Sequence, residues 1–206
     1  MNNTEEHILK ELNITDKVIS IFKYGSQVYG TADEKSDSDY IIVMMSSMLK
    51  DGSFRSSSPR SNSDKTIQGV IYSRGGFMDA INTYDIAALE CISLGDEAVI
   101  KNIWNNFKVT NWNEKEMIKK VIQKASASRH VADQQAKSGN KDRAKKGMFH
   151  ALRILHFGLQ LKEHRKIVDF GACNDMHFEF KNMDVDDFDT RDYYREFDEL
   201  LAKLRA

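Results

Sequence analysis

The sequence contains very little proline and cysteine. Pro59 is the one proline among 206 residues, and the two cysteines are Cys91 and Cys173. Two distant cysteines without CxxC spacing provide neither a disulfide framework nor the usual ligand spacing of a zinc site. Such thiols are typical of buried positions in a protein of a reducing compartment. We therefore expect a cytoplasmic protein with both cysteines in its core.

Net charge and long apolar runs are also missing. Thirty Lys and Arg face 31 Asp and Glu, which leaves a formal net charge of −1 and gives no electrostatic evidence for a nucleic-acid partner. No segment approaches the roughly 18 apolar residues of a membrane helix, so we expect no membrane partner. The first residues, MNNTEEHILKELN, are too polar and acidic for a signal peptide. Hydrophobic residues make up 41% of the chain, enough for one large or two small domains.

The first half of the chain alternates short apolar runs with turn residues. The β-branched runs VISIFKY (18–24), DYIIVMM (39–45) and TIQGVIYS (66–73) predict three strands. Apolar residues at helical spacing predict a helix over 75–94. Residues 46–65 are rich in serine, carry both signs of charge and lack an apolar period, which predicts a long mobile loop.

The second half carries helical patterns without proline. Apolar residues recur at intervals of three and four over 114–137 and 142–164, and the polar SGNK between them favours two antiparallel helices. A last amphipathic helix is expected from about residue 188. The buried stripe of the second long helix would comprise Met148, Leu152, Leu155 and Leu159. Together the patterns predict an α+β fold, mixed over 1–95 and helical over 96–206.

Two acidic residues, Asp37 and Asp39, stand one residue apart where the second strand begins. Side chains on a strand alternate between its faces, so this pair projects to one side, about 7 Å apart, and suits a hard divalent cation. Gly25-Ser26 ends the first strand, and SQVYG could form one helical turn whose backbone N–H groups and serine hydroxyl would bind an anion. Each feature alone is common in solvated turns. If the two strands pair, however, a triphosphate and Mg²⁺ would be neighbours, as metal-assisted nucleotidyl transfer requires.

The order of strand, Gly-Ser, ten intervening residues, Asp-x-Asp and strand resembles the signature of the nucleotidyltransferase superfamily of the DNA polymerase β type. The resemblance implies that Gly25 and Ser26 bind the β- and γ-phosphates of a nucleoside triphosphate, with ATP favoured. It implies that Asp37 and Asp39 are the catalytic residues and hold two Mg²⁺ ions at the α-phosphate. It also implies a small nucleotidyltransferase-type sheet with flanking helices, followed by a C-terminal helical bundle.

Members of that superfamily usually carry a third carboxylate on a later strand. The matching strand here, 66–73, contains no acid, and Gln68 stands at the expected position. An amide oxygen carries no negative charge, so glutamine is a poor base and a weak magnesium ligand. Three explanations are open. Asp64 substitutes for the missing acid, Asp85 or Glu90 reaches in from the following helix, or the chemistry is weakened or lost.

A basic stripe lies on the second long helix, where Lys146, His150 and Arg153 follow one another at i, i+4 and i+7. Periodicity alone favours a solvated basic face with His150 packed at its edge, although Lys and Arg neutralise phosphate oxygens well. The surrounding pattern KK-x-x-FH-x-x-RIL-x-FG-x-Q, with KIVDF and Asn174 after it and DI-x-ALEC (85–91) before it, resembles a subgroup of predicted nucleotidyltransferases. That subgroup includes phage and bacterial proteins associated with RNA ligase and RNA repair. The resemblance implies that the three basic residues bind nucleotide.

The expected function is the Mg²⁺-dependent transfer of a nucleoside monophosphate from NTP to an acceptor hydroxyl. An RNA end is favoured as acceptor by the company of the subgroup, and a side chain of a partner protein, which would be AMPylated, is the rival. A catalytically silent nucleotide- or RNA-binding module is the second class of function. A purely structural or interaction protein is the third.

Overall fold

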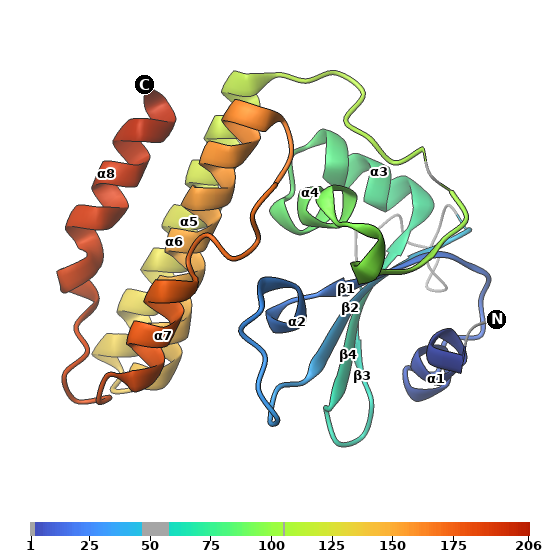
Figure 1. Ribbon diagram of the computed structural model, residues 1–206, viewed down its shortest axis with the longest axis horizontal. Helices are drawn as coiled ribbons and strands as arrows, with labels where there is room; N and C mark the ends of the chain where they lie inside the picture. Colours follow the sequence, from blue (N-terminus) through green and yellow to red (C-terminus); the bar gives the residue numbers. More distant parts are fainter. Residues whose placement is uncertain (1–2, 47–57, 105) are drawn as a thin grey trace. The chain divides into compact units, whose positions relative to one another are not determined.

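The chain divides into two compact units, Met1–Trp112 and Asn113–Ala206 (Figure 1). The computed structural model describes residues 3–46, 58–104 and 106–206. The fold is α+β, as the sequence predicts, with a mixed sheet and flanking helices in the first unit and helices in the second. The second unit begins after Trp112 rather than at residue 96, because residues 96–102 add a 3-10 turn and a strand to the first unit. The expectation of helix from residue 96 onward is wrong for this segment.

The first unit is built on a five-stranded sheet of order β3-β4-β2-β1-β5. β2 and β4 are parallel, and the other neighbours are antiparallel. The strands are β1 (Val18–Tyr24), β2 (Ser38–Met44), β3 (Ser58–Ser61), β4 (Ile67–Ser73) and β5 (Val99–Asn102). The three strands that the sequence predicts therefore form the centre of the sheet, and two short strands form its edges.

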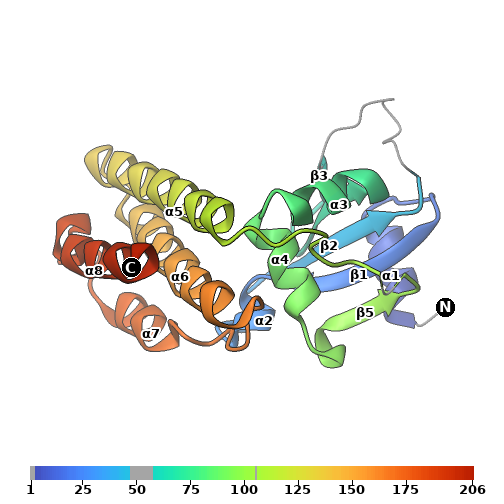
Figure 2. The ribbon, with the colours of Figure 1, turned by 90° about the horizontal axis from the view of Figure 1, so that it is seen from above.

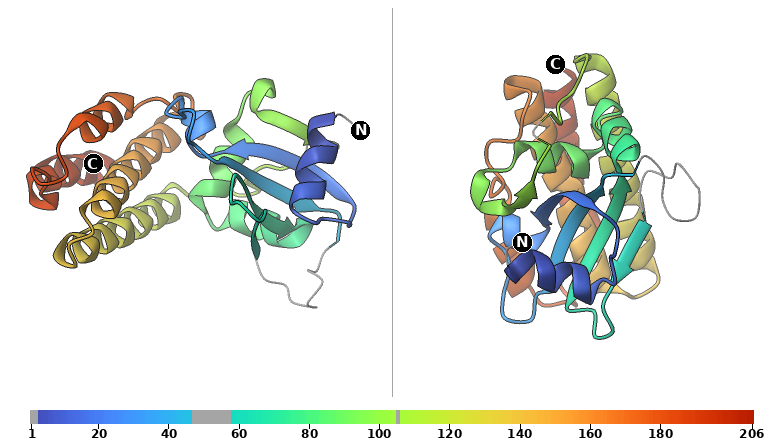
Figure 3. Two further views of the ribbon diagram at one scale, coloured as in Figure 1. Left: turned by 90° about the horizontal axis from the view of Figure 1, so that it is seen from below. Right: turned by 90° about the vertical axis from the view of Figure 1, so that its right-hand side faces the viewer.

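Helices cover both faces of this sheet, with α1 on one face and α3 and α4 on the other (Figures 2 and 3). Along β2, Ile42 joins the core cluster under α1, whereas Ile41 and Val43 join the cluster under α3 and α4. Strand alternation therefore places Asp39 on the face that α3 and α4 cover. The helical elements of this unit are α1 (Asn3–Glu11), α2 (Ser26–Tyr29), α3 (Arg74–Asn82), α4 (Ile86–Ser93) and the 3-10 turn η1 (Asp96–Ala98).

Strand β3 corrects part of the loop that the sequence predicts over 46–65. Residues 58–61 pair with β4 in an antiparallel register from Ser58↔Ile71 to Ser61↔Gln68. The segment SPRS is too short and too polar to show an alternating apolar pattern, so the strand leaves no signal in the sequence. Pro59 is tolerated because β3 is an edge strand, which can lack a ladder N–H. Residues 47–57 of the predicted loop lie outside the described residues.

The prediction of a single helix over 75–94 is also wrong, because a turn separates α3 from α4. Tyr84 takes a left-handed conformation with φ of 61°. Asp85 then caps α4, its Oδ1 accepting a hydrogen bond of 3.3 Å from the Ala88 N–H. The Tyr84 hydroxyl donates to the backbone oxygen of Asn111 at 3.0 Å. Tyr84 thus makes a tertiary contact that a helical period would not reveal.

The second unit centres on the two long helices α5 (Glu114–Lys137) and α6 (Lys141–His164), which run antiparallel as predicted (Figure 1). Three members of the predicted α6 stripe, Met148, Leu152 and Leu155, are fully buried, and Leu159 is half-buried. The helices approach closely at Gly158, where an added Cβ would lie 2.5 Å from Cγ1 of Val121. In the described ranges, neither these helices nor any other has the apolar length to cross a bilayer.

The last predicted helix begins at Tyr194 rather than near residue 188. It is α8 (Tyr194–Arg205), preceded by the 3-10 turn η2 (Thr190–Tyr193). The sequence does not predict α7 (Asn174–Asn182), since Phe180 is its one buried residue and gives no period. The Phe180 ring packs edge-on against Phe188 and Tyr193, at centroid distances of 5.5 and 4.5 Å. Both cysteines are free and buried, as expected.

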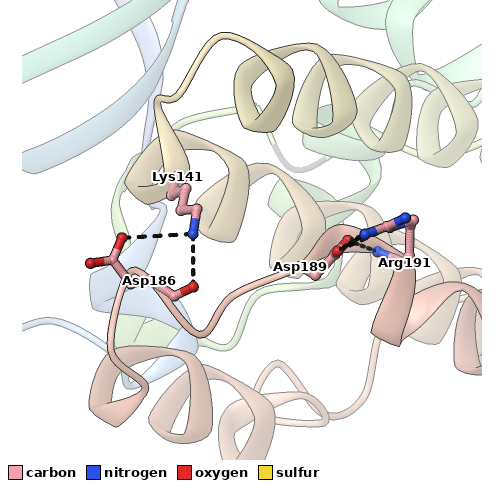
Figure 4. Close-up of polar contacts among 4 residues, drawn as sticks. All are labelled: Lys141, Asp186, Asp189 and Arg191. Carbon is pink, nitrogen blue, oxygen red and sulfur yellow. Dashed lines mark hydrogen bonds and ion pairs between the residues drawn. The ribbon is translucent and has the colours of Figure 1, made fainter.

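Two charged contacts hold the acidic segment between α7 and α8 (Figure 4). Lys141 donates from Nζ to the backbone oxygen of Asp186 at 2.7 Å. The Asp186 carboxylate oxygen Oδ1 lies 3.7 Å from the same nitrogen. The Asp189 carboxylate pairs with the Arg191 guanidinium and accepts from the Arg191 N–H at 2.9 Å. Exposed pairs such as these add little to stability. The two contacts give Asp186 and Asp189 cationic partners within the second unit.

Candidate functional site

The antiparallel pairing of β1 and β2 brings the Gly25-Ser26 turn beside the acid pair. The register places Tyr24 opposite Asp39, so the turn that follows Tyr24 lies next to the entry of β2. Gly25 has φ of 73° and ψ of −149° and precedes the predicted single turn of helix, α2. An added Cβ at Gly25 would lie 2.6 Å from Oδ2 of Asp39. The backbone of the turn and the Asp39 carboxylate are therefore in direct contact, which only glycine permits here.

The acid pair consists of Asp37, just before β2, and Asp39 on the strand, both half-buried. Burial, together with the smaller effect of the neighbouring charge of Asp37, raises the pKa of Asp39 to about 6. A cation bound beside the pair would favour the ionised form of the Asp39 carboxylate. Their oxygens are the ligands that Mg²⁺ prefers. The donor set and the close turn fit a cation with a phosphate beside it.

Gln68 completes this group from β4. The parallel register pairs its Cα with that of Asp39. Its side-chain amide Nε2 donates to Oδ2 of Asp37. An amide N–H thus points at the carboxylate where a third acid would present an oxygen. The described part of the chain contains no group of three or more His, Cys, Asp and Glu side chains that could hold a metal ion.

The other candidates for the third acid are engaged elsewhere. Asp64 is exposed and accepts from the Thr66 hydroxyl and N–H at 2.7 and 3.1 Å, bonds that lower its pKa. Asp85 is the N-cap of α4. Glu90 is 2% exposed and accepts from the Tyr29 hydroxyl at 2.5 Å. Each of these carboxylates therefore already accepts a hydrogen bond within the first unit.

Hydrogen bonds from Tyr29 and Gln27 connect α2 to its surroundings, and sequence reasoning missed both. The Tyr29 hydroxyl reaches Glu90 on α4, and the Gln27 amide Nε2 donates to the Ser38 hydroxyl at 2.7 Å. Tyr29 also packs edge-on against Tyr24, with ring centroids 6.3 Å apart. The signal that could have found the first contact is Glu90 itself, because it is the one acid in the apolar helix IAALECIS.

The predicted basic stripe lies on α6 in the second unit. Lys146 is exposed, whereas Arg153 is 8% exposed and His150 is half-buried. An Arg153 amino group contacts Nδ1 of His150 at 2.9 Å, and the guanidinium lies 5.2 Å from the centre of the Phe149 ring. Burial, together with the smaller effects of the Arg153 and Lys124 charges, lowers the pKa of His150 to about 4. His150 is thus neutral at neutral pH and accepts from Arg153.

The comparisons with known proteins give little beyond this geometry. No protein-family model matches the chain, and no curated protein matches it. Among solved structures, a nucleotidyltransferase-like protein from Exiguobacterium sibiricum 255-15 is similar over 97% of this chain and 71% of its own, with 12% identity and a TM-score of 0.35. A likeness of that strength defines neither substrate nor activity.

Proposed function

We propose that the protein is a Mg²⁺-dependent nucleotidyltransferase that moves a nucleoside monophosphate from NTP, with ATP favoured, to an acceptor hydroxyl. One observation carries the proposal. The Gly25 backbone lies against the Asp39 carboxylate, so an anion on the turn and a cation on the acid pair would be adjacent. That adjacency is what the binding of a metal–triphosphate complex requires.

The residues of the chain would act by binding and positioning. The turn at Gly25 and Ser26 would hold the β- and γ-phosphates through backbone N–H groups and the half-buried Ser26 hydroxyl. Asp37 and Asp39 would hold Mg²⁺, which when bound neutralises charge on the phosphates. The acceptor oxygen then bonds to the α-phosphorus, the bond from that phosphorus to the β-bridging oxygen breaks, pyrophosphate leaves, and the hydroxyl proton passes to solvent. Such catalysis is mostly positioning and charge stabilisation.

The acceptor that we propose is the hydroxyl of an RNA end. Support for it comes from the sequence resemblance to nucleotidyltransferases associated with RNA repair, and from nothing in the geometry. A hydroxyl on a partner protein is the other arm of the test. Lys146, His150 and Arg153 are proposed to contact the nucleotide, and the exposed Lys146 amine is the member of the three that solvent reaches most freely.

A catalytically silent nucleotide-binding module is the second candidate function, and Gln68 favours it. The amide of Gln68 contacts Asp37 and supplies no negative charge to a second cation. Asp64, Asp85 and Glu90 have other partners. A site with two carboxylates can hold one metal-bound nucleotide while lacking the ligands for the ion that activates a hydroxyl.

The test measures transfer of label from α-³²P NTPs with Mg²⁺ to RNA oligonucleotides and to proteins. Transfer should occur with wild type, disappear in the double variant Asp37→Asn/Asp39→Asn, and persist in Asp79→Asn, which neutralises an exposed acid on α3. Label that survives the double substitution would contradict the proposed function. Metal-dependent NTP binding without transfer, and transfer gained by Gln68→Glu, would instead identify the silent module.

A further inference from the structure

We propose that Glu90 is a positioning residue that holds the Gly25-Ser26 turn against the acid pair through the hydroxyl of Tyr29. The proposal rests on the proposed function for its consequence, since the turn is where the phosphates would bind. Glu90 lies on α4 and Tyr29 is the last residue of α2, so the contact joins two elements 61 positions apart in the sequence. Neither residue takes part in the transfer itself.

The burial of Glu90 is the first reason. Its neighbours on α4, Ala88, Leu89 and Cys91, are apolar and at most 2% exposed, and Glu90 is itself only 2% exposed. A carboxyl group removed from water is costly unless it is hydrogen-bonded, whereas an apolar side chain at this position would have no such cost. The hydrogen bond from Tyr29, at 2.5 Å, is what an apolar residue could not accept.

The shortness of α2 is the second reason. A single turn of four residues is not stable by itself, so its place depends on tertiary contacts. Tyr29 is 3% exposed and is the buried side chain of this helix. Its N–H bonds back to the Gly25 oxygen at 3.2 Å, as does that of Val28 at 3.0 Å. A shift of the Tyr29 ring is therefore transmitted over one helical turn to Gly25.

The close contact between Gly25 and Asp39, at the start of α2, is the third reason. Gly25 lies so close to Asp39 that its missing Cβ would be 2.6 Å from Oδ2. A turn in such contact with the acid pair has little room, and a small displacement changes the gap between phosphate and cation sites. Glu90, Tyr29, Gly25 and Asp39 thus form one chain of contacts from α4 to the entry of β2. Removing the hydrogen bond between Tyr29 and Glu90 should weaken nucleotide binding more than it lowers the overall stability.

The chain offers a matched control in Tyr84. It is also buried, at 5% exposed, and its hydroxyl donates at 3.0 Å to a backbone oxygen of the same unit. Tyr29→Phe and Tyr84→Phe each remove one buried hydroxyl. Tyr29→Phe should weaken binding of a non-hydrolysable ATP analogue with Mg²⁺ roughly three- to tenfold, the loss expected for one ordinary hydrogen bond. Tyr84→Phe should leave that affinity unchanged while lowering the unfolding temperature comparably.

Two substitutions of Glu90 distinguish a positioning role of this residue from a role in packing. Glu90→Gln retains an acceptor oxygen for Tyr29 and should keep most of the affinity, whereas Glu90→Leu should match Tyr29→Phe. In steady-state transfer the change should appear in the KM for NTP, with kcat less affected. Equal losses of affinity in Tyr29→Phe and Tyr84→Phe, or no loss in Glu90→Leu, would overturn the proposal.

Hydrogen exchange of the peptide covering 24–31 tests the link without nucleotide. Its protected amides include those of Val28, Tyr29 and Thr31, which bond within the turn. Exchange there should accelerate in Tyr29→Phe and Glu90→Leu and stay unchanged in Tyr84→Phe. If wild type binds no nucleotide, the proposed function fails while this measurement still decides whether Glu90 holds the turn. Unchanged exchange in both variants would overturn the positioning role.

Discussion

Gly25 shows how one residue can carry both a backbone and a contact requirement. Its φ of 73° with ψ of −149° lies in a region that essentially only glycine occupies. Its hydrogen in place of a side chain also makes room for Asp39. Sequence reasoning could place the Gly-Ser pair before the acids, because the order of strands and turns is visible there. It could not show the contact, which depends on the register of β1 and β2.

Substitution of Gly25 should therefore lower the free energy of unfolding by more than the strain of its backbone conformation alone. Gly139 is the matched control, because its φ is 81° and an added Cβ would meet no atom within 4 Å. Gly139→Ala should lose about 1–2 kcal/mol of unfolding free energy from the left-handed backbone. Gly25→Ala should lose at least about 1 kcal/mol more from the clash with Asp39, together with nucleotide binding. Urea unfolding of both variants measures the difference, and equal losses would show that the contact carries no cost.

At the scale of elements, the central strands and long helices were predictable and the edges were not. β1, α5 and α6 have enough residues for their apolar periods to stand out, and β1 and α5 begin and end where the sequence predicts. β3, β5 and α7 are short or mostly exposed, so tertiary pairing decides them rather than pattern. The same reason hid the link from Tyr29 to Glu90, since no local rule joins a one-turn helix to a helix 61 positions away.

Helix α6 makes a prediction about pH, because its His150 is packed beside two cationic side chains. The pKa of His150 falls from 6.5 to about 4 through burial and the charges of Arg153 and Lys124. Between about pH 4 and 6.5, His150 takes up a proton when the protein unfolds. The contribution of neutral His150 to stability is therefore complete above about pH 6.5 and is lost as pH falls toward 4. The loss should approach about 3 kcal/mol at most. His150→Gln should flatten the stability of the protein between pH 4 and 6.5, measured by urea unfolding at several pH values. A slope that is unchanged in the variant would show that other groups cause it.

At the scale of the whole molecule, the candidate site residues divide between the two units. Gly25, Ser26 and the acid pair belong to the first, whereas the basic stripe belongs to the second. The sequence resemblance assigns both sets to one nucleotide. Within the second unit, Arg153 already stacks on aromatic rings and contacts His150, so packing accounts for it. The exposed Lys146 has no such explanation from packing, and it is the residue that decides whether the second unit contributes.

The corresponding prediction compares two exposed lysines of the second unit, Lys146 on α6 and Lys120 on α5. If Lys146 binds phosphate in the full chain, Lys146→Ala should weaken binding of the non-hydrolysable ATP analogue roughly fivefold, the effect of about 1 kcal/mol. That loss should shrink as salt rises, because exposed charges are screened. Lys120→Ala removes the same charge and should change the affinity little. Equal small effects of the two substitutions, measured by calorimetry at low and high salt, would confine nucleotide binding to the first unit.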